Sequence, residues 1–338
     1  MMKNKSPLLI LAFVFFLVLA TIYILGEQKT KKATSSNMKT VKIAINQFIE
    51  HPNLDQVIEG FKATLISWGN SNNIKITYDI KNASKDIKTM LSIVQNNNRG
   101  NSDLILTLTT PSAQVTAKGI KGKPIIFAAI TDPIHAGLVK SLESPHERNI
   151  TGVTDSAPYE QQFKLFKKVF PDSKTIGVLH NPGEANSEAS LKIIRRIAKE
   201  NAFKIKEVPV SNINDVVLAT KSLISDIDLL YLPADNTVVS SIVAIAKIAK
   251  AKKVPLLASD EGSVKDGALF TLGVNYYSSG VEAAKKAILI LEGTNASAIH
   301  VTKSESVRLI VNSKSFEKYG IPIPESFNKY IDNIVYYK

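Results

Sequence analysis

The 338-residue sequence contains no cysteine. Disulfide bridges, cysteine-based zinc sites and thiol nucleophiles are therefore excluded, and so is a lipid anchor on a leader cysteine. Aromatic residues make up only 7% of the chain and do not interleave with a basic stripe, which argues against nucleic-acid binding. The five histidines show no spacing typical of metal ligands, so we expect neither a metal nor a cofactor.

The remaining composition is that of a folded protein with a basic surface. Apolar residues make up 44% of the chain, an ordinary share for a globular core, and the length suits about two domains. The net charge is +12, and residues 1–40 hold six lysines against the single acid Glu27. The rest of the basic excess is lysine scattered over predicted helix faces, which is typical of a solvated surface.

The long hydrophobic run lies at residues 8–25, and it is about long enough to cross a bilayer. A cleaved secretory signal usually has a shorter apolar core and small residues near the cleavage site, where this chain has Tyr23, Ile24 and Leu25. We therefore expect residues 1–40 to be an uncleaved signal-anchor with a polar tether. The rest would be exported and held at the outer face of the cytoplasmic membrane, or would be periplasmic or extracellular if the leader is cleaved.

Strands and helices alternate after the tether, judged from apolar residues at periods of two and 3.6. The first half predicts strands at 41–45, 74–78, 103–108 and 124–129 and helices at 54–68, 84–97 and 112–118. The second half predicts strands at 175–179, 204–208, 228–232 and 254–258 and helices at 188–201, 213–225 and 238–251. This repeated order predicts an α/β protein with two similar Rossmann-like lobes, each a parallel sheet with helices on both faces.

Such sheets bind ligands outside the carboxyl ends of their strands. In this chain the strand-end segments are rich in amides, hydroxyls and carboxylates. They are residues 46–51, 109–114, 131–133, 180–187, 233–237 and 259–261. If the two lobes face each other, all six segments line one cleft.

Several separate motifs occur in order between residues 41 and 322. They are Gln47-Phe-Ile-Glu-His-Pro-Asn-Leu-Asp55, Thr131-Asp-Pro133, Ile150-Thr-Gly-Val-Thr-Asp155, Ile176-Gly-Val-Leu-His-Asn-Pro-Gly-Glu-Ala-Asn-Ser187, Asp235-Asn-Thr-Val-Val-Ser240 and Leu272-Gly-Val-Asn-Tyr-Tyr277. With these motifs the chain resembles the ABC transporter substrate-binding proteins of the tryptophan/tyrosine-binding type. The resemblance implies a type I periplasmic-binding-protein fold that closes on an aromatic amino acid or a related small molecule. It also implies delivery to the permease subunits of an importer, and we expect a monomer.

The resemblance further implies where the chain crosses between the lobes, in a hinge of three segments. Crossings near 155–158, 275–279 and 301 would give a lobe 1 of residues 41–154 plus 278–300 and a lobe 2 of residues 155–277 plus 301–338. Two features depart from the family pattern. One is the hydrophobic anchor, and the other is Ser259-Asp-Glu-Gly-Ser263 in place of a commoner Gly-Asp-Thr-Asp-Ser.

The carboxylate and ammonium groups of an amino acid suggest which residues would bind it. Thr110 and Ser112 open a predicted helix, whose free N–H groups attract an anion such as a carboxylate. A buried ammonium needs an acid, and we rank Asp155 and Asp235 ahead of Asp132 and Asp260. Each of these residues has an ordinary alternative role as a helix cap or a hinge hydrogen bond.

An aromatic ligand side chain needs an apolar wall, for which Phe48, Tyr159 and Tyr276 are candidates, although the pattern favours a place in the core for each. His51 and His180 lie on strand-end loops and could contact a ligand. The full set of expected ligand-binding residues is Gln47, Phe48, Thr110, Ser112, Ala113, Thr131, Asp132, Asp155, Glu184, Ala185, Asn186, Ser187, Asp235, Asn236, Asp260 and Tyr276.

Two other functions stay open. One is a membrane-anchored ectodomain that senses a ligand with the same fold. The other is a cleft enzyme in which Glu184 works with Asp155 or Asp235 as acid and base. No nucleophile elbow, glycine-rich phosphate loop or metal cluster is visible in the sequence, so we expect a binding protein and not an enzyme.

Overall fold

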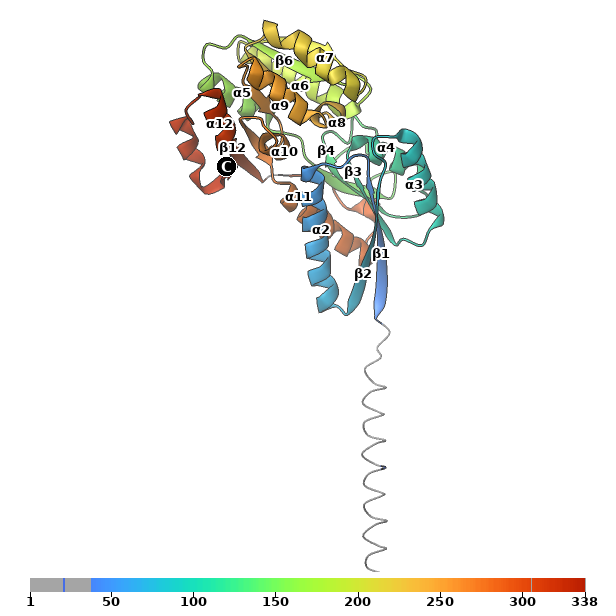
Figure 1. The fold of residues 1–338 in the computed structure, drawn as a ribbon. Coiled ribbons are helices and arrows are strands. Elements are labelled where there is room, and N and C mark those ends of the chain that lie inside the picture. Colours follow the sequence, from blue (N-terminus) through green and yellow to red (C-terminus); the bar gives the residue numbers. More distant parts are fainter. Residues whose placement is uncertain (1–20, 22–37, 305, 338) are drawn as a thin grey trace, which may run out of the picture.

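The computed structural model describes residue 21 and residues 38–304 and 306–337. The predicted anchor at residues 8–25 lies outside this part, apart from Thr21, and so does most of the tether. No helix within the described residues is long and apolar enough to cross a membrane. The described chain folds into two α/β lobes, which are stacked one above the other in Figure 1.

Lobe 1 is built on a six-stranded parallel sheet with the strand order β11-β5-β4-β3-β1-β2. Its strands are β1 (Lys39–Gln47), β2 (Ile74–Asn82), β3 (Leu104–Leu108), β4 (Ile125–Ile130), β5 (Ile150–Thr154) and β11 (Thr302–Lys303). Its helices are α2 (Pro52–Ser71), α3 (Ile87–Arg99), α4 (Thr110–Gly119) and α11 (Tyr276–Leu291), with the short turn η2 (Ala296–Ala298).

The two faces of this sheet bury different helices, because successive side chains of a strand point to opposite faces. Leu104, Leu106 and Leu108 of β3 pack in a core with α2 and α11. Ile105 of the same strand packs in a second core with α3 and α4. The near-continuous apolar run of β3 is therefore typical of a parallel strand that is covered on both sides.

Lobe 2 contains a four-stranded parallel sheet in the order β7-β6-β8-β9 and a three-stranded sheet in the order β10-β12-β13. Its strands are β6 (Thr175–His180), β7 (Lys204–Pro209), β8 (Leu229–Leu232), β9 (Leu256–Ala258), β10 (Phe270–Val274), β12 (Val307–Asn312) and β13 (Ile334–Tyr337). Its helices are α5 (Tyr159–Val169), α6 (Ala185–Glu200), α7 (Ile213–Leu223), α8 (Asn236–Val239), α9 (Ile242–Ala251), α10 (Glu261–Lys265) and α12 (Ser313–Tyr319), with η1 (Ile224–Asp226) and η3 (Glu325–Asn333).

The predicted duplication is confirmed by the strand order. In lobe 1 the first four strands lie in the order β2-β1-β3-β4, and in lobe 2 the corresponding strands lie as β7-β6-β8-β9. One predicted element differs, since the helix expected at 238–251 is two helices, α8 and α9, that are separated at Ser240 and Ser241. The Ser240 hydroxyl donates to the carbonyl of Thr237, which is a local bond that competes with the helical ladder.

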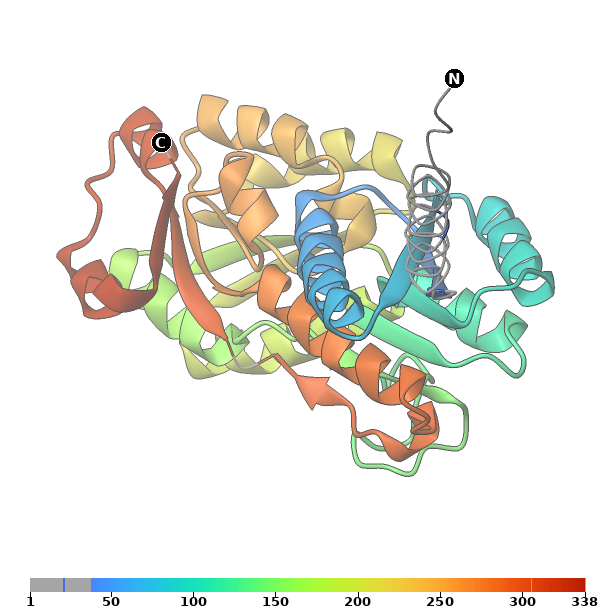
Figure 2. The ribbon, with the colours of Figure 1, turned by 90° about the horizontal axis from the view of Figure 1, so that it is seen from below.

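Helix α11 returns the chain to lobe 1, where it packs along α2; the two helices lie side by side in both Figure 1 and Figure 2. Two glycines permit this close approach. A Cβ on Gly60 would lie 2.2 Å from the carbonyl oxygen of Tyr277, and one on Gly280 would lie 2.1 Å from that of Val57. Only glycine therefore fits at either position of this helix pair.

The last crossing lies slightly later than the sequence suggested. Thr302 and Lys303 pair with Val153 and Thr154 of β5, so they belong to the sheet of lobe 1 and not to lobe 2. Lobe 2 resumes at β12, whose strand pairs antiparallel with β10. The carboxyl ends of the parallel strands in both lobes meet at the boundary between the lobes.

Candidate functional site: a pocket between the lobes

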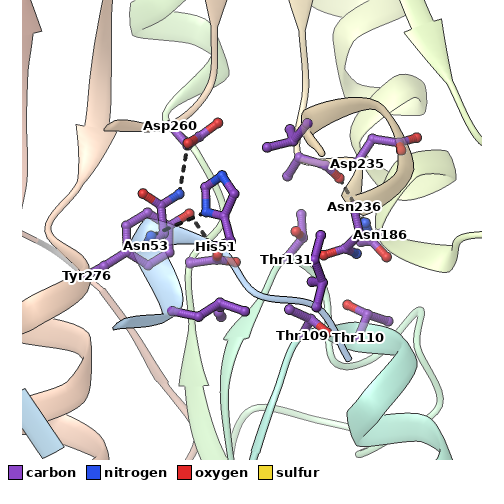
Figure 3. Close-up of a pocket in the computed structure, with 16 residues that line it drawn as sticks. His51, Asn53, Thr109, Thr110, Thr131, Asn186, Asp235, Asn236, Asp260 and Tyr276 are labelled. Carbon is purple, nitrogen blue, oxygen red and sulfur yellow. Dashed lines mark hydrogen bonds between the residues drawn. The ribbon is translucent and has the colours of Figure 1, made fainter. Parts of the chain in front are cut away.

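A pocket lies where the strand ends of the two lobes meet, with about 520 Å³ of space including the part that is open to solvent. Figure 3 shows Tyr276, Asn53 and Asp260 on one side of the pocket and Asn186, Asn236 and Thr110 on the other. Sixteen residues line it: Ile49, His51, Asn53, Leu54, Thr109, Thr110, Ala129, Thr131, Asp155, Asn186, Ala234, Asp235, Asn236, Val239, Asp260 and Tyr276.

Half of the residues expected from the sequence line this pocket. They are Thr110, Thr131, Asp155, Asn186, Asp235, Asn236, Asp260 and Tyr276. The structure places the other half outside the lining, namely Gln47, Phe48, Ser112, Ala113, Asp132, Glu184, Ala185 and Ser187. Most of the residues that lie outside are buried in a core or hold neighbouring turns and helix ends.

In lobe 1 the side chains outside the pocket face the core or cap local turns. Phe48 and Ala113 are buried in the core beneath α3 and α4. The Ser112 hydroxyl lies 2.8 Å from that of Thr107, and Asp132 Oδ1 accepts from the backbone N–H groups of residues 134 and 135. Gln47 ends β1 and lines a different surface hollow beside α2. Position at a strand end was therefore a correct guide to the segment but not to the direction of each side chain.

Glu184 and Ser187 do not line the pocket but hold the lobe 2 residues that do. The Glu184 carboxylate accepts hydrogen bonds from both the backbone and the side chain of Asn236 and of Thr237, at 2.7–3.0 Å. The Ser187 hydroxyl donates to Asp235 Oδ2 at 2.6 Å, and Ala185 is the first residue of α6. These contacts fix the N-terminus of α8 against that of α6.

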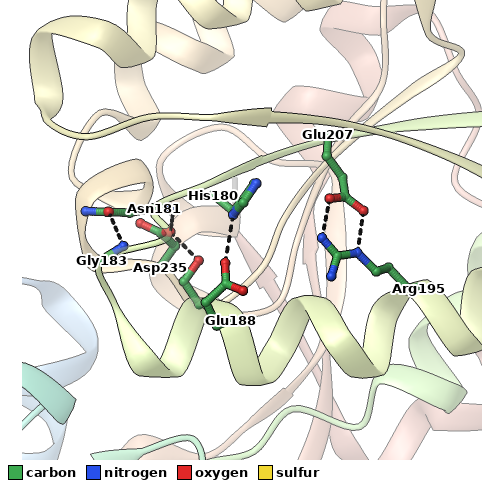
Figure 4. Close-up of polar contacts among 8 residues, drawn as sticks. His180, Asn181, Gly183, Glu188, Arg195, Glu207 and Asp235 are labelled. Atoms are coloured by element: carbon green, nitrogen blue, oxygen red, sulfur yellow. Dashed lines mark hydrogen bonds and ion pairs between the residues drawn. The ribbon is translucent and has the colours of Figure 1, made fainter.

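Asp235 lines the pocket, but both of its oxygens are occupied within lobe 2. It accepts from the backbone N–H of Asn181 at 2.5 Å, from that of Val238 at 2.9 Å and from the Ser187 hydroxyl. Figure 4 shows Asp235 beside Asn181 and Gly183 at the start of α6, with His180 and Glu188 paired next to them. Burial, and then the nearby charge of Glu184, raise the pKa of Asp235 to about 6. Asp235 is thus primarily a helix cap.

Asp260 is also committed to neighbouring donors. It caps α10 through the N–H and the hydroxyl of Ser263, at 2.9 and 2.7 Å, and it accepts from Asn53 Nδ2 at 2.8 Å. Both carboxylate oxygens therefore have partners. Among the four acids proposed from the sequence, one lines the pocket and has a carboxylate oxygen without a hydrogen-bond partner in the described residues.

That acid is Asp155, which lies at the first crossing and is 9% exposed. Its Oδ2 accepts from the Tyr276 hydroxyl at 3.0 Å, while its Oδ1 is buried with no hydrogen-bond partner among the described residues. Burial is the main cause that raises the pKa of Asp155 to about 6, and the charge of Asp260 adds to it. A buried carboxylate with one unpaired oxygen favours a cationic donor beside it.

Thr109, at the start of α4, lies at a point that favours a negatively charged group, whereas Asp155 favours a positively charged one. Its φ of 73° is a strained value for a β-branched residue, and within the described chain no group bonds its buried hydroxyl. Helix α4 begins directly after it without a side-chain cap. The N–H groups of the first helical turn and this hydroxyl together favour an anion.

Two further pocket atoms are buried without a partner among the residues that the structure describes, Asn186 Oδ1 and His51 Nε2. Asn186 is held in place because its Nδ2 donates to Glu184 Oε2 and to the carbonyl oxygen of Ala234. His51 Nδ1 accepts from the backbone N–H of Asn53 at 3.2 Å, which leaves Nε2 as the protonated nitrogen of a neutral ring. Four unpaired polar atoms in one pocket need an explanation, and a polar ligand provides one.

Three aromatic residues were candidates for the pocket wall, and the structure keeps one. Tyr276 lines the pocket, whereas Phe48 is in the lobe 1 core and Tyr159 is 3% exposed in the lobe 2 core, with its hydroxyl bonded to Ser190 at 2.7 Å. The apolar wall otherwise comes from residues that the sequence reasoning missed, chiefly Ile49, Leu54 and Val239. Ile49 lies inside the predicted segment 46–51, and Leu54 and Val239 lie three and two residues beyond predicted segments, so slightly wider segments with their apolar residues counted would have included all three.

The model of the ABC transporter substrate binding protein family matches residues 42–335. A curated protein named "Tyrosine-binding protein" from Clostridioides difficile (strain R20291) is 37% identical over 292 residues, which cover 86% of this chain and 84% of that protein.

Two solved structures are also similar. One, an ABC domain from Streptococcus pneumoniae in complex with L-Trp, is 30% identical, with a TM-score of 0.82 over 88% of this chain and all of that one. The other is the ligand-free, open structure of a substrate-binding protein with adhesive properties from Clostridium difficile. It is 36% identical, with a TM-score of 0.68 over 88% of this chain and 99% of that one.

Proposed function

Because the chain belongs to the family of ABC transporter substrate-binding proteins, we propose that it binds one aromatic amino acid in the pocket between its lobes. Proteins of this family bind a solute for an importer and perform no chemistry on it. The pocket is the place for that solute, since it lies at the carboxyl ends of the strands in both sheets.

Asp155 is the residue that we assign to the ligand ammonium. Its unpaired Oδ1 is the carboxylate oxygen of the pocket that other groups leave free among the described residues. An ammonium at this point would satisfy the oxygen and compensate the buried charge. Asp235 and Asp260 contribute negative potential but have their own hydrogen-bond donors.

The ligand carboxylate is assigned to the start of α4. The backbone N–H of Thr110 and the hydroxyl of Thr109 lie there, and the helix dipole adds to their attraction for an anion. The two ends of a zwitterion would then meet opposite charge on lobe 1 and at the hinge. The side chain of the ligand would extend along Ile49, Leu54, Val239 and Tyr276.

The aromatic nature of the ligand rests on two relatives, one named for tyrosine and one solved with L-Trp. Their identities to this chain, 37% and 30%, make a shared ligand class a reasonable proposal. The alternative function, a cleft enzyme, would need Glu184 in the pocket as an acid or base. Glu184 instead lies outside the pocket lining and holds the N-terminus of α8.

The observation that carries this proposal is the group of four buried, unpaired polar atoms in one pocket. The test is a thermal-shift screen of the full chain in mild detergent with each of the twenty amino acids, followed by calorimetry. Tyrosine or tryptophan should raise the melting temperature, and a ligand at 100 times its Kd should add about 2.7 kcal/mol to the free energy of unfolding. A flat response to every amino acid would refute the assignment.

We further propose that the lobes work outside the cytoplasmic membrane as a monomer that docks on permease subunits, as members of the family do. The N-terminal hydrophobic run at residues 8–25 would hold the chain at the membrane. Alkaline washing of native membranes tests this anchor. The chain should stay with the membrane at full length, and recovery of a soluble, shortened chain would show that the leader is cleaved.

A further inference from the structure

Asn53 lies in the first turn of α2 in lobe 1, but its side chain bonds to lobe 2. Its Nδ2 donates to Asp260 Oδ1 at 2.8 Å, and its Oδ1 accepts from the backbone N–H of Gly262 at 2.9 Å. Asp260 and Gly262 form the N-terminal end of α10. Asn53 is 4% exposed, so the amide is held in a closed environment, and Figure 3 shows it directed at Asp260.

These two bonds differ from the other contacts between the lobes. Apart from bonds at the three crossings, they are the side-chain hydrogen bonds that join lobe 1 to lobe 2 in the described part of the chain. Bonds at the crossings, such as Tyr276 to Asp155, link segments that the backbone already connects. The bonds of Asn53 link residues more than 200 positions apart and are lost when α2 and α10 separate.

Gly262 allows the approach from the side of lobe 2. A Cβ at this position would lie 2.7 Å from His51 Cε1 and 2.9 Å from Asn53 Oδ1, and both atoms belong to lobe 1. The backbone of Gly262 does not require a left-handed conformation, so the need for glycine here comes from the neighbouring lobe. A larger residue would require either these two side chains or α10 itself to shift.

We propose that Asn53 and Gly262 form the contact that holds the two lobes closed, and that they are positioning residues for ligand capture. The proposal rests on the proposed function, because closure of the lobes contributes to affinity only for a ligand that binds between them. The apparent affinity of a two-state binding protein scales with the fraction that is in the binding-competent state. Weakening this contact therefore lowers affinity through closure, even at a residue that does not touch the ligand.

The absence of cysteine makes closure directly measurable, because Lys118→Cys on α4 and Lys192→Cys on α6 give two unique, exposed label sites on opposite lobes. Pulsed electron paramagnetic resonance on the spin-labelled full chain in mild detergent reports the distance between the lobes. We expect Gly262→Ala to shift the distribution to longer distances. We also expect it to raise the Kd for L-tyrosine or L-tryptophan at least tenfold, which is about 1.4 kcal/mol.

Ser263→Ala is the matched control, because it removes a hydroxyl bond within α10 and leaves the contact with lobe 1 unchanged. It should keep the wild-type distance distribution. Asn53→Ala should lengthen the distance as Gly262→Ala does. If Asn53→Ala weakens binding but the distances stay as in the wild type, Asn53 is only a ligand contact and the proposal is wrong.

A Gly262→Ala chain with the wild-type distance distribution would also overturn the proposal. The distance measurement needs no ligand, so it decides the closure contact even if neither amino acid binds. A failure of the ligand assignment and a failure of the closure contact are therefore distinguishable.

Discussion

At the scale of single residues, Asp155 and Asp235 look alike in the sequence and differ in three dimensions. Both follow a strand or precede a helix, both are buried, and burial raises the pKa of each to about 6. Asp235 uses its oxygens on three donors of its own lobe, whereas Asp155 keeps Oδ1 unpaired within the described chain. The two carboxylates should therefore respond differently to the same substitution.

Ligand affinity should fall with decreasing pH because Asp155 must be charged to hold an ammonium. With a pKa of about 6, the carboxylate is ionised at pH 7.5 and protonated at pH 5, so the Kd should rise by up to about tenfold per pH unit below 6. Calorimetry between pH 5 and 8 checks this. Asp155→Asn should bind weakly with a flat pH profile, and a wild-type profile in that variant would rule out Asp155 as the ammonium partner.

The raised pKa values of Asp155 and Asp235 also affect folding, and in the opposite direction to ligand affinity: they favour the folded state at low pH. A carboxyl group whose pKa is higher in the folded state than in the unfolded state stabilises the fold at low pH, and this contribution is lost as the pH rises through about 6. Because Asp235 caps α8, we expect Asp235→Asn to change mainly the stability of the fold. It should leave most of the ligand affinity in place, in contrast to Asp155→Asn.

At the scale of elements, the pair α2 and α11 fixes lobe 1. Gly60 and Gly280 let these helices approach so closely that an added Cβ would lie 2.2 or 2.1 Å from a carbonyl oxygen of the partner helix. Gly60→Ala or Gly280→Ala should lower the free energy of unfolding by about 1–3 kcal/mol or more through overpacking. Denaturant titration measures this, with Ser67→Ala on the exposed face of α2 as the control. Equal stability of the glycine variants and this control would contradict the described packing.

Most elements could be predicted from periodicity, since parallel strands covered on both faces have continuous apolar runs and the helices have apolar stripes. The split of α8 from α9 could not, because it depends on the Ser240 hydroxyl bonding to Thr237.

For the site, the sequence predicted which segments lie at the pocket but not which of their side chains line it. Strand-end position brought Thr110, Asp155 and Asn186 to the pocket, but it could not tell that Ser112 and Ala113 turn toward the core.

The bond of Asn53 to Asp260 was also beyond sequence reasoning. The two residues are 207 positions apart, and each has an ordinary local explanation as part of a helix start. Contacts between lobes depend on how the lobes are set against each other, which local patterns do not encode. The same holds for the free oxygen of Asp155, because its availability depends on what every neighbouring element donates.

At the scale of the whole molecule, the duplicated architecture explains the site. Two sheets with the same strand order place their carboxyl ends against each other, and the pocket lies in the gap. Lobe 1 supplies the start of α4 and lobe 2 supplies the rim of α6 and α8, while Asp155 and Tyr276 lie at the crossings. A ligand held by all three parts would be enclosed as the lobes close, which is a hinge motion.

The most direct test is a crystal structure of the chain grown with the amino acid that gives the largest thermal shift. The ligand should lie between the lobes, with its ammonium in hydrogen-bonding contact with Asp155 Oδ1 and its carboxylate at the start of α4. Ligand density at another surface, or an ammonium that avoids Asp155, would contradict the account.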